Sequence, residues 1–150
     1  MIEIRGMRWW DIDAVHAIEE SSFPVDRWSV EQFWGELAQS TRHYVVACEG
    51  DEVVGYAGAF ILAPDSDVQT IAVAESARGQ GVGRLLMDEL LRAARAAGCT
   101  QMMLEVREDA TAATALYTSL GFEVVSRRRD YYAPGSDALI MRRRPLAEAP

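Results

Sequence analysis

A glycine-rich segment in the middle of the chain has the residue types and spacing of an anion-binding loop. An apolar, strand-like run of Ile71, Ala72 and Val73 precedes it, and an amphipathic, helix-like stretch follows it. Glycine lets the backbone come close to a ligand, and the first turn of a helix offers unpaired N–H donors and the positive end of its dipole. The segment therefore predicts a loop that holds a phosphate or pyrophosphate group. Its residues are Arg78, Gly79, Gln80, Gly81, Val82, Gly83 and Arg84.

Two common phosphate-binding loops do not fit this segment. A Walker-type loop needs a lysine on the phosphates, and all fifteen basic residues of this chain are arginine. The Rossmann pattern needs a third glycine where this sequence has Leu86, counted from Gly81, or Arg84, counted from Gly79. The absence of lysine also excludes chemistry through a lysine Schiff base. A different class of phosphate loop is therefore indicated.

Glu105 and Tyr117 are the two side chains best suited to acid–base chemistry. Glu105 interrupts an apolar, strand-like run, where burial would make its carboxylate a stronger base. The alternative is a structural glutamate paired with an arginine such as Arg107. Tyr117 lies beside an apolar helical stripe, and a phenol keeps its proton at neutral pH while still able to donate it. On position alone, Tyr117 is more often a core tyrosine.

The elements that must position these residues alternate in type along the chain. Apolar alternation or continuous apolar runs predict strands over residues 1–7, 43–49, 52–62, 67–73, 101–106, 122–129 and 137–141. Helices are predicted after Asp11, after the capping box of Ser29 and Gln32, over 83–97 up to Gly98, and over 111–120. The run 101–106 hardly alternates, which predicts burial on both faces. This order predicts a mixed α/β fold, antiparallel first and parallel around the glycine segment.

Length and composition predict one domain with a substantial core. The chain has 150 residues, of which 49% are hydrophobic and 25% charged, as in an ordinary globular protein. We expect one domain over residues 1–144 and a frayed tail over 145–150. A signal-peptide pattern and long apolar runs are both absent from the sequence, so a cytoplasmic protein is expected. Cys48 and Cys99 have no companion at metal-ligand spacing, which favours buried, reduced thiols and no metal site.

The charge balance bears on the partners of the protein. A formal net charge of −8 argues against direct contact with nucleic acid. It fits a cationic substrate, such as an amine or a basic peptide. The alternative is that an acidic surface only keeps the protein soluble.

Several motifs occur in a fixed order along nearly the whole chain, from about Glu3 to Met141. Phe23-Pro24 and Trp28-Ser29 come first, and Arg78-x-x-Gly81-x-Gly83 follows. After these come Leu104-Glu105-Val106-Arg107, Ala115-Leu116-Tyr117 with Gly121-Phe122, and Arg128-Arg129-Asp130-Tyr131-Tyr132. The glycine spacing resembles the pyrophosphate loop of the GCN5-related N-acetyltransferase (GNAT) family. The whole set resembles one branch of that family, the bacterial ribosomal-protein-alanine N-acetyltransferases.

The resemblance implies a fold and a co-substrate. The implied GNAT fold has a central, mixed and mostly antiparallel sheet flanked by helices, with a parallel strand pair splayed at the acetyl-CoA site. Acetyl-CoA would place its pyrophosphate on the loop of residues 78–84. Its pantetheine arm would bind the main chain of Ile71, Ala72 and Val73 as an added strand does, and an N–H near Val73 would polarise the acetyl carbonyl.

The resemblance also implies roles for individual side chains. Glu105 would be the general base, acting through water, and Tyr117 would protonate the departing thiolate. Tyr131 and Tyr132 would wall the entrance for a peptide, although ordinary sheet packing is an alternative for both.

One residue departs from the branch. Ala110 stands where the branch has an asparagine that hydrogen-bonds the cofactor arm. Asp109 or Thr111 would have to supply that contact instead.

The resemblance implies Nα-acetylation of a ribosomal protein that begins with alanine. Two other functions stay open from the sequence. One is a small-amine, polyamine or lysine acetyltransferase of the same fold, and the other is a non-catalytic acyl-CoA-binding module. The expected partner is the N-terminus of a protein or peptide, with neither nucleic acid nor a membrane in direct contact, and the sequence predicts no oligomeric state.

Overall fold

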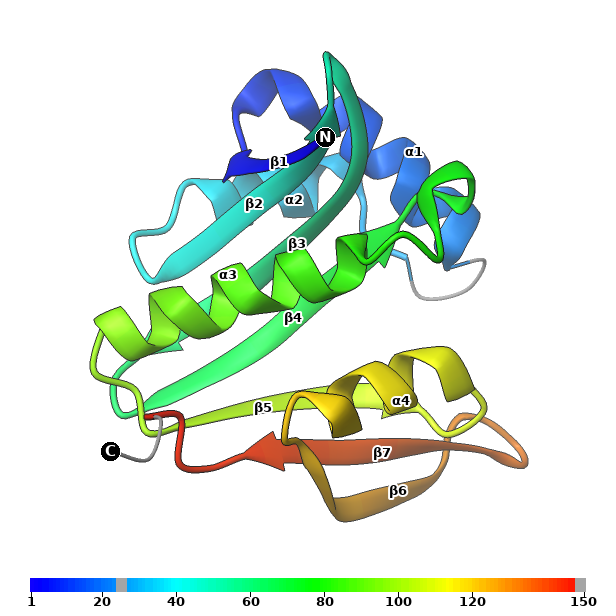
Figure 1. Cartoon of the computed structure of the whole chain (residues 1–150). Helices are drawn as coiled ribbons and strands as arrows, with labels where there is room; N and C mark the ends of the chain where they lie inside the picture. The colour runs from blue at the N-terminus through cyan, green and yellow to red at the C-terminus, as the bar shows by residue number, and fades with distance from the viewer. Residues whose placement is uncertain (24–26, 148–150) are drawn as a thin grey trace.

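Seven strands form one mixed sheet in the order β1-β2-β3-β4-β5-β7-β6. The structure is a computed structural model that describes residues 1–23 and 27–147 (Figure 1). Strands β4 and β5 pair in parallel, and the other five neighbouring pairs are antiparallel. The mixed, mostly antiparallel sheet predicted from the sequence is therefore confirmed. The strands are β1 (Ile2–Gly6), β2 (Arg42–Glu49), β3 (Glu52–Leu62), β4 (Asp65–Val73), β5 (Gln101–Arg107), β6 (Glu123–Ala133) and β7 (Ser136–Arg143).

Helices cover both faces of the sheet. They are α1 (Ile12–Ser22), α2 (Val30–Leu37), α3 (Val82–Ala96) and α4 (Thr111–Ser119), with short 3-10 turns η1 (Trp9–Asp11) and η2 (Glu75–Ala77). Side chains of α3 and α4 belong to one buried cluster, whereas α1 and α2 contribute to a second. In Figure 1, α3 and α4 lie in front of the sheet and α1 and α2 behind it. The element order expected from the sequence is confirmed throughout the described residues.

Strands β4 and β5 run together only at their start. In the described part of the chain their pairing extends from Asp65–Gln101 to Asp67–Met103, after which the strands diverge (Figure 1). Just beyond this point β4 carries a bulge, because Val68 pairs with Ala59 and Thr70 with Gly58. A bulge bends its strand and increases the local twist. The splayed parallel pair expected from the resemblance is therefore present.

The expected burial of β5 on both faces is wrong. Met102, Leu104 and Val106 are buried, whereas Glu105 and Arg107 are not. The reason is that α1 and α2 pack chiefly on β2, β3 and β4. One face of β5 is therefore left open beside the splay, and Glu105 lies on that face.

Of the two helix caps predicted from the sequence, the one before α2 is present and the one before α1 is not. The capping box is confirmed, since Ser29 Oγ accepts the Gln32 N–H at 3.2 Å and Gln32 Oε1 accepts the Ser29 N–H at 2.8 Å. Asp11 does not cap α1 with its side chain. Its carboxylate accepts the Arg8 N–H at 2.8 Å and binds the Arg5 guanidinium, and so it closes the preceding turn.

The C-terminal segment is not frayed where it is described. Leu146 is fully buried, its N–H donates to the Thr100 carbonyl at 3.1 Å, and its carbonyl accepts from Arg95 Nε at 2.8 Å. The expectation of a frayed tail from residue 145 is therefore wrong for Leu146, because an apolar side chain here completes the core. Residues 148–150 lie outside the described part of the chain. Cys48 and Cys99 are buried, free thiols, and burial raises the pKa of each.

Candidate active site

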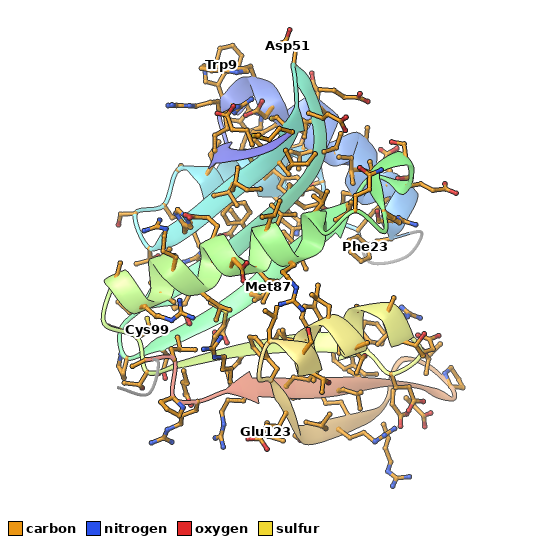
Figure 2. The ribbon with its side chains drawn as sticks, viewed as in Figure 1. Trp9, Phe23, Asp51, Met87, Cys99 and Glu123 are labelled. Carbon is orange, nitrogen blue, oxygen red and sulfur yellow. The ribbon has the colours of Figure 1, made fainter. Side chains whose placement is uncertain are left out.

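A cavity of about 370 Å³ opens where β4 and β5 separate. Glu105 and Tyr117 both line it, although β5 presents Glu105 on one face of the sheet and Tyr117 belongs to the helix on the other face. In Figure 2, Phe23 lies at the open end of the same gap. The lining residues come from α1, β4, β5, α4 and β6 and from the segments beside them: Glu19, Phe23, Trp28, Val68, Gln69, Thr70, Ile71, Leu104, Glu105, Val106, Arg107, Ala110, Ala113, Tyr117 and Tyr132.

Glu105 is less buried than its apolar neighbours suggest. Its side chain is 33% exposed, and Oε1 lies 3.3 Å from Nη1 of Arg128. The expectation that Glu105 is buried among its apolar neighbours is therefore wrong, because its face of β5 is uncovered. The paired arginine is Arg128 rather than Arg107, whose guanidinium lies over the Tyr132 ring at 4.3 Å. Glu105 also lines a second cavity, of about 350 Å³, with Asp67 and Arg128.

Tyr117 is the buried member of the pair. Its side chain is 6% exposed and packs edge to face on Phe122, with ring centroids 6.1 Å apart. Burial raises the pKa of Tyr117 to about 12. The phenol therefore keeps its proton near neutral pH, as a proton donor must.

Glu19 is a buried carboxylate in the cavity wall that the sequence analysis did not single out. It is 2% exposed and accepts hydrogen bonds from the Tyr56 hydroxyl, from Thr70 Oγ1 at 3.2 Å and from the Trp28 N–H at 2.9 Å. A charge without its hydrogen bonds would be costly at this depth. The available signal was its position four residues after Val15, on the apolar stripe of α1.

The glycine loop has a backbone suited to phosphate. Gly79 and Gly81 have φ values of +78° and +80°, which side-chain-bearing residues rarely adopt. The first intrahelical hydrogen bond of α3 runs from Leu85 N–H to Gly81 C=O, so the three preceding N–H groups stand at the free, positive end of the helix. This arrangement fits the pyrophosphate of coenzyme A. Gly83 allows close packing of α3 against α4, because a Cβ there would lie 3.2 Å from the Leu116 side chain.

Side chains of the loop are engaged by the protein itself. Arg78 Nε donates to the Val73 carbonyl at 3.0 Å, and Arg84 donates to Ser119 Oγ of α4 at 2.6 Å. Gln80 reaches the Ser76 carbonyl at 3.5 Å. These contacts shape the loop, and its contacts to a phosphate would therefore come from backbone N–H groups.

The end of β4 offers main-chain groups to the gap. Ala74 N–H donates to Val54 of β3 at 2.8 Å. Because backbone groups alternate along an antiparallel strand, those of Val73 and Ile71 point away from β3, toward the gap. Ile71 lines the cavity, while Ala72 is buried in the core behind it. The geometry fits an extended pantetheine arm lying along β4.

The two tyrosines of the β6–β7 hairpin have different positions. Tyr132 lines the cavity, whereas Tyr131 is 50% exposed and lies under the Arg128 guanidinium, 5.2 Å from its ring centroid. Their rings pack edge to face, 5.1 Å apart. The structure therefore brings Tyr132, but not Tyr131, to the cavity wall.

Neither Asp109 nor Thr111, beside Ala110 at the start of α4, reaches the cavity where the cofactor arm is expected. The described residues of the cavity wall include Ala110 but neither Asp109 nor Thr111. Asp109 is largely exposed and lies 3.8 Å from Arg107. The structure therefore offers no side-chain replacement at this point of the wall.

The splayed parallel strand pair and the glycine loop at the start of α3 together form a site suited to an acyl-coenzyme A. Residues 8–122 match the acetyltransferase (GNAT) family, and the chain belongs to that family. It is therefore an acetyl-CoA-dependent N-acetyltransferase. No helix in the described part of the chain is long and apolar enough to cross a membrane.

Relatives that are named as N-acetyltransferases are similar to this chain over most of their length. The chain is 45% identical over 123 residues to the N-alpha-acetyltransferase RimI of Mycobacterium tuberculosis, covering 79% of this chain and 76% of that protein. It is 30% identical over 146 residues to the [ribosomal protein bS18]-alanine N-acetyltransferase of Escherichia coli K12, covering 94% and 96%. The crystal structure of the ribosomal-protein-S18-alanine N-acetyltransferase from Escherichia coli superposes on this chain with a TM-score of 0.89. The two chains are 28% identical, and the match covers 100% of this chain and 97% of that one.

One relative is much longer than this chain. An uncharacterised protein of Mycobacterium leprae is 44% identical over 139 residues, which are 89% of this chain but only 38% of that protein.

Proposed function

We propose that this enzyme transfers the acetyl group of acetyl-CoA to the N-terminal alanine of a ribosomal protein. The observation that carries the proposal is one cavity, at the gap between β4 and β5, lined by both Glu105 and Tyr117. The names of the relatives from Mycobacterium tuberculosis and Escherichia coli support the choice of an Nα-amine on a ribosomal protein.

The proposed reaction is a direct transfer. Acetyl-CoA supplies a thioester whose carbon–sulfur bond breaks as the new carbon–nitrogen bond forms. Glu105 takes a proton from the acceptor amine through a water molecule, and its exposed side chain leaves room for that water. Tyr117 gives its phenolic proton to the departing thiolate. The main chain at Val73 polarises the acetyl carbonyl as an oxyanion hole.

An α-amine is easier to deprotonate than the side chain of lysine. The pKa of an α-amino group is about 7.7–8.0, against about 10.4 for lysine, so roughly a tenth of it is already neutral at pH 7. A carboxylate that acts through water therefore has to deprotonate a smaller fraction of the acceptor when the acceptor is an N-terminal amine than when it is a lysine side chain.

The cavity wall also suits a peptide. Phe23, Trp28 and Tyr132 supply aromatic surface, and Gln69 and Thr70 supply polar groups. Ligand sites are typically lined by apolar and aromatic side chains with a few polar groups. The net charge of −8 would attract a basic acceptor.

A thiol-release assay with acetyl-CoA and a panel of acceptors tests the proposal. The panel contains matched peptides that begin with Ala, Ser or Met, the Ala peptide with a blocked amino group and an internal lysine, and spermidine. We expect the free Ala peptide to give the highest kcat/KM and the blocked peptide to be inactive. Faster turnover of spermidine or of the blocked lysine peptide would overturn the proposed acceptor. Mass spectrometry locates the acetyl group, and the enzyme has no lysine to accept one itself.

A further inference from the structure

The last hairpin contains an unusual bulge beside the cavity. Arg128 of β6 pairs with Ala138 of β7, and the next pair is Ala133 with Ser136. Residues 129–132 therefore stand opposite the single residue Asp137. Bulges of this kind re-aim side chains, and they are common next to active sites. Here the bulge contains Tyr132, which lines the cavity.

Asp137 binds the bulge at its centre. Its Oδ1 accepts the Asp130 N–H at 2.9 Å, and its Oδ2 accepts from Arg127 at 3.0 Å. The Asp130 N–H, followed by Arg127, holds the pKa of Asp137 below its usual range. The carboxylate is therefore charged at neutral pH, and charged acceptors make the stronger hydrogen bonds.

The same residue connects the bulge to the cavity strand. The Glu108 N–H donates to the Asp137 carbonyl at 3.1 Å, and the Glu108 carboxylate binds Arg127. Glu108 directly follows Arg107, whose guanidinium lies over the Tyr132 ring. Asp137 is thus bound on one side to the bulge and on the other to the end of β5.

The backbone of the bulge needs such support. Asp130 has φ +53° and is the one non-glycine residue with positive φ in the described ranges. This conformation is unfavourable for a side-chain-bearing residue, and it persists where surrounding bonds impose it. Its N–H is bound by Asp137, and its own Oδ1 accepts the Gly135 N–H at 2.6 Å.

We infer that Asp137 is a positioning residue for the acceptor, which holds the 129–132 bulge so that Tyr132 faces the cavity. Asp137 does not line the cavity itself, and it acts through Tyr132. The inference rests on the proposed function in one respect, namely that the acceptor peptide occupies the wall formed by Tyr132. The proposed acetyl-CoA site is formed by the glycine loop and β4, whereas Asp137 belongs to β7. We therefore expect that binding of acetyl-CoA does not depend on Asp137.

Steady-state kinetics of three variants tests the inference. Asp137→Ala removes both side-chain acceptors, and Asp137→Asn keeps one oxygen for the Asp130 N–H. Asp51→Ala is the matched control, because Asp51 lies in the distant β2–β3 turn (Figure 2). For Asp137→Ala we expect the peptide KM to rise about tenfold, while kcat and the Kd of acetyl-CoA stay within about twofold. Asp137→Asn should restore the peptide KM to within about threefold of wild type.

A double-mutant cycle with Tyr132→Ala separates positioning from general loosening of the hairpin. If Asp137 acts through Tyr132, the Tyr132→Ala change should have little further effect on peptide KM in the Asp137→Ala background. Additive effects would overturn the inference, as would an unchanged peptide KM or a parallel loss of acetyl-CoA affinity in Asp137→Ala.

Two provisions keep this test decisive. If Asp137→Ala does not fold, Asp137→Ser replaces it, because the shorter side chain loses the carboxylate that binds both the Asp130 N–H and Arg127; an unchanged peptide KM would again overturn the inference. The acceptor used is the best one in the wild-type panel. Failure of the alanine peptide there would overturn the proposed function, whereas the dependence on Asp137 would be judged with the acceptor that works.

Discussion

Arg128 and Glu105 are ion-paired across the sheet, with Nη1 and Oε1 3.3 Å apart, although their strands β6 and β5 are separated by β7. The proposed base therefore has a cation beside it before any acceptor arrives. Arg128 is 56% exposed, and so the pair lies at the solvent-facing side of the sheet.

We predict that Arg128→Ala changes the free energy of unfolding by about 1 kcal/mol or less, because solvent screens an exposed pair. Urea denaturation measures this. Arg92→Ala, which removes the exposed partner of Glu89, serves as a control of similar kind. A loss of more than about 2 kcal/mol would show that the pair with Glu105 is a main structural contact.

Glu105→Gln should lower kcat by about 10²–10⁴-fold, the usual contribution of a general base. Calorimetric titration should give an unchanged Kd for acetyl-CoA, since the loop of residues 78–84 is not altered. Glu123→Gln, on the exposed edge strand β6 (Figure 2), is the matched control and should keep full activity. An undiminished rate in Glu105→Gln would rule out the proposed base.

Tyr117→Phe should lower kcat by about 10²-fold or more, because it removes the proton for the leaving thiolate while keeping the ring packed on Phe122. The pKa of Tyr117 is about 12, so the protonated, active phenol persists as pH rises to about 10. Single-turnover rates from pH 7 to 10 should therefore show no decline caused by this group. A wild-type decline in that range that Tyr117→Phe abolishes would contradict the raised pKa of Tyr117, whereas an undiminished kcat in Tyr117→Phe would contradict its role as the proton donor.

The same phenol should make the fold less stable at high pH. Its pKa rises from its usual 10.0 to about 12 on folding, so between these values the unfolded chain loses the proton and the folded protein keeps it. Since the unfolded state then binds fewer protons, the free energy of unfolding falls as pH rises. The contribution of Tyr117 is at most about 2–3 kcal/mol. Denaturation at pH 8 and 11 should show a smaller decrease for Tyr117→Phe than for wild type; an equal decrease would contradict this.

Glu19→Gln should destabilise the fold by about 1–3 kcal/mol. The new amide NH₂ cannot accept hydrogen bonds, so it leaves at least one of the three buried donors unpaired. The neighbouring Glu20→Gln is the control, because Glu20 is exposed and pairs with His16 at 3.2 Å; its effect should stay within about 0.5 kcal/mol. Equal effects of the two substitutions would mean that Glu19 is not the structural acceptor described above.

Local signals in the sequence were sufficient for the order of the elements. The Ser29–Gln32 capping box, the helical spacing before Gly98 and the strand from Glu52 to Leu62 each act over a few neighbouring residues. The glycine spacing at Gly79 and Gly81 was likewise readable, because positive φ values strongly favour glycine. Glu105 and Tyr117 stood out because each places a polar group on an apolar element.

Contacts between distant parts of the chain were beyond such signals. The pairing of Glu105 with Arg128, the burial of Glu19 against Tyr56 and Thr70, and the docking of Leu146 each depend on which elements pack together. The open face of β5 was missed for the same reason, since a run of apolar letters does not say how far a covering helix extends.

The amino-acid order by itself determined the strands and the helices, because these follow from backbone propensity and short-range periodicity. It also predicted a phosphate loop and two candidate acid–base residues, because their residue types and spacing suit that chemistry. Only the tertiary structure decided that β4 and β5 part after Asp67 and Met103, and that one cavity there receives a carboxylate from one side and a phenol from the other. Sheet register and helix coverage control that geometry, and both arise from long-range packing.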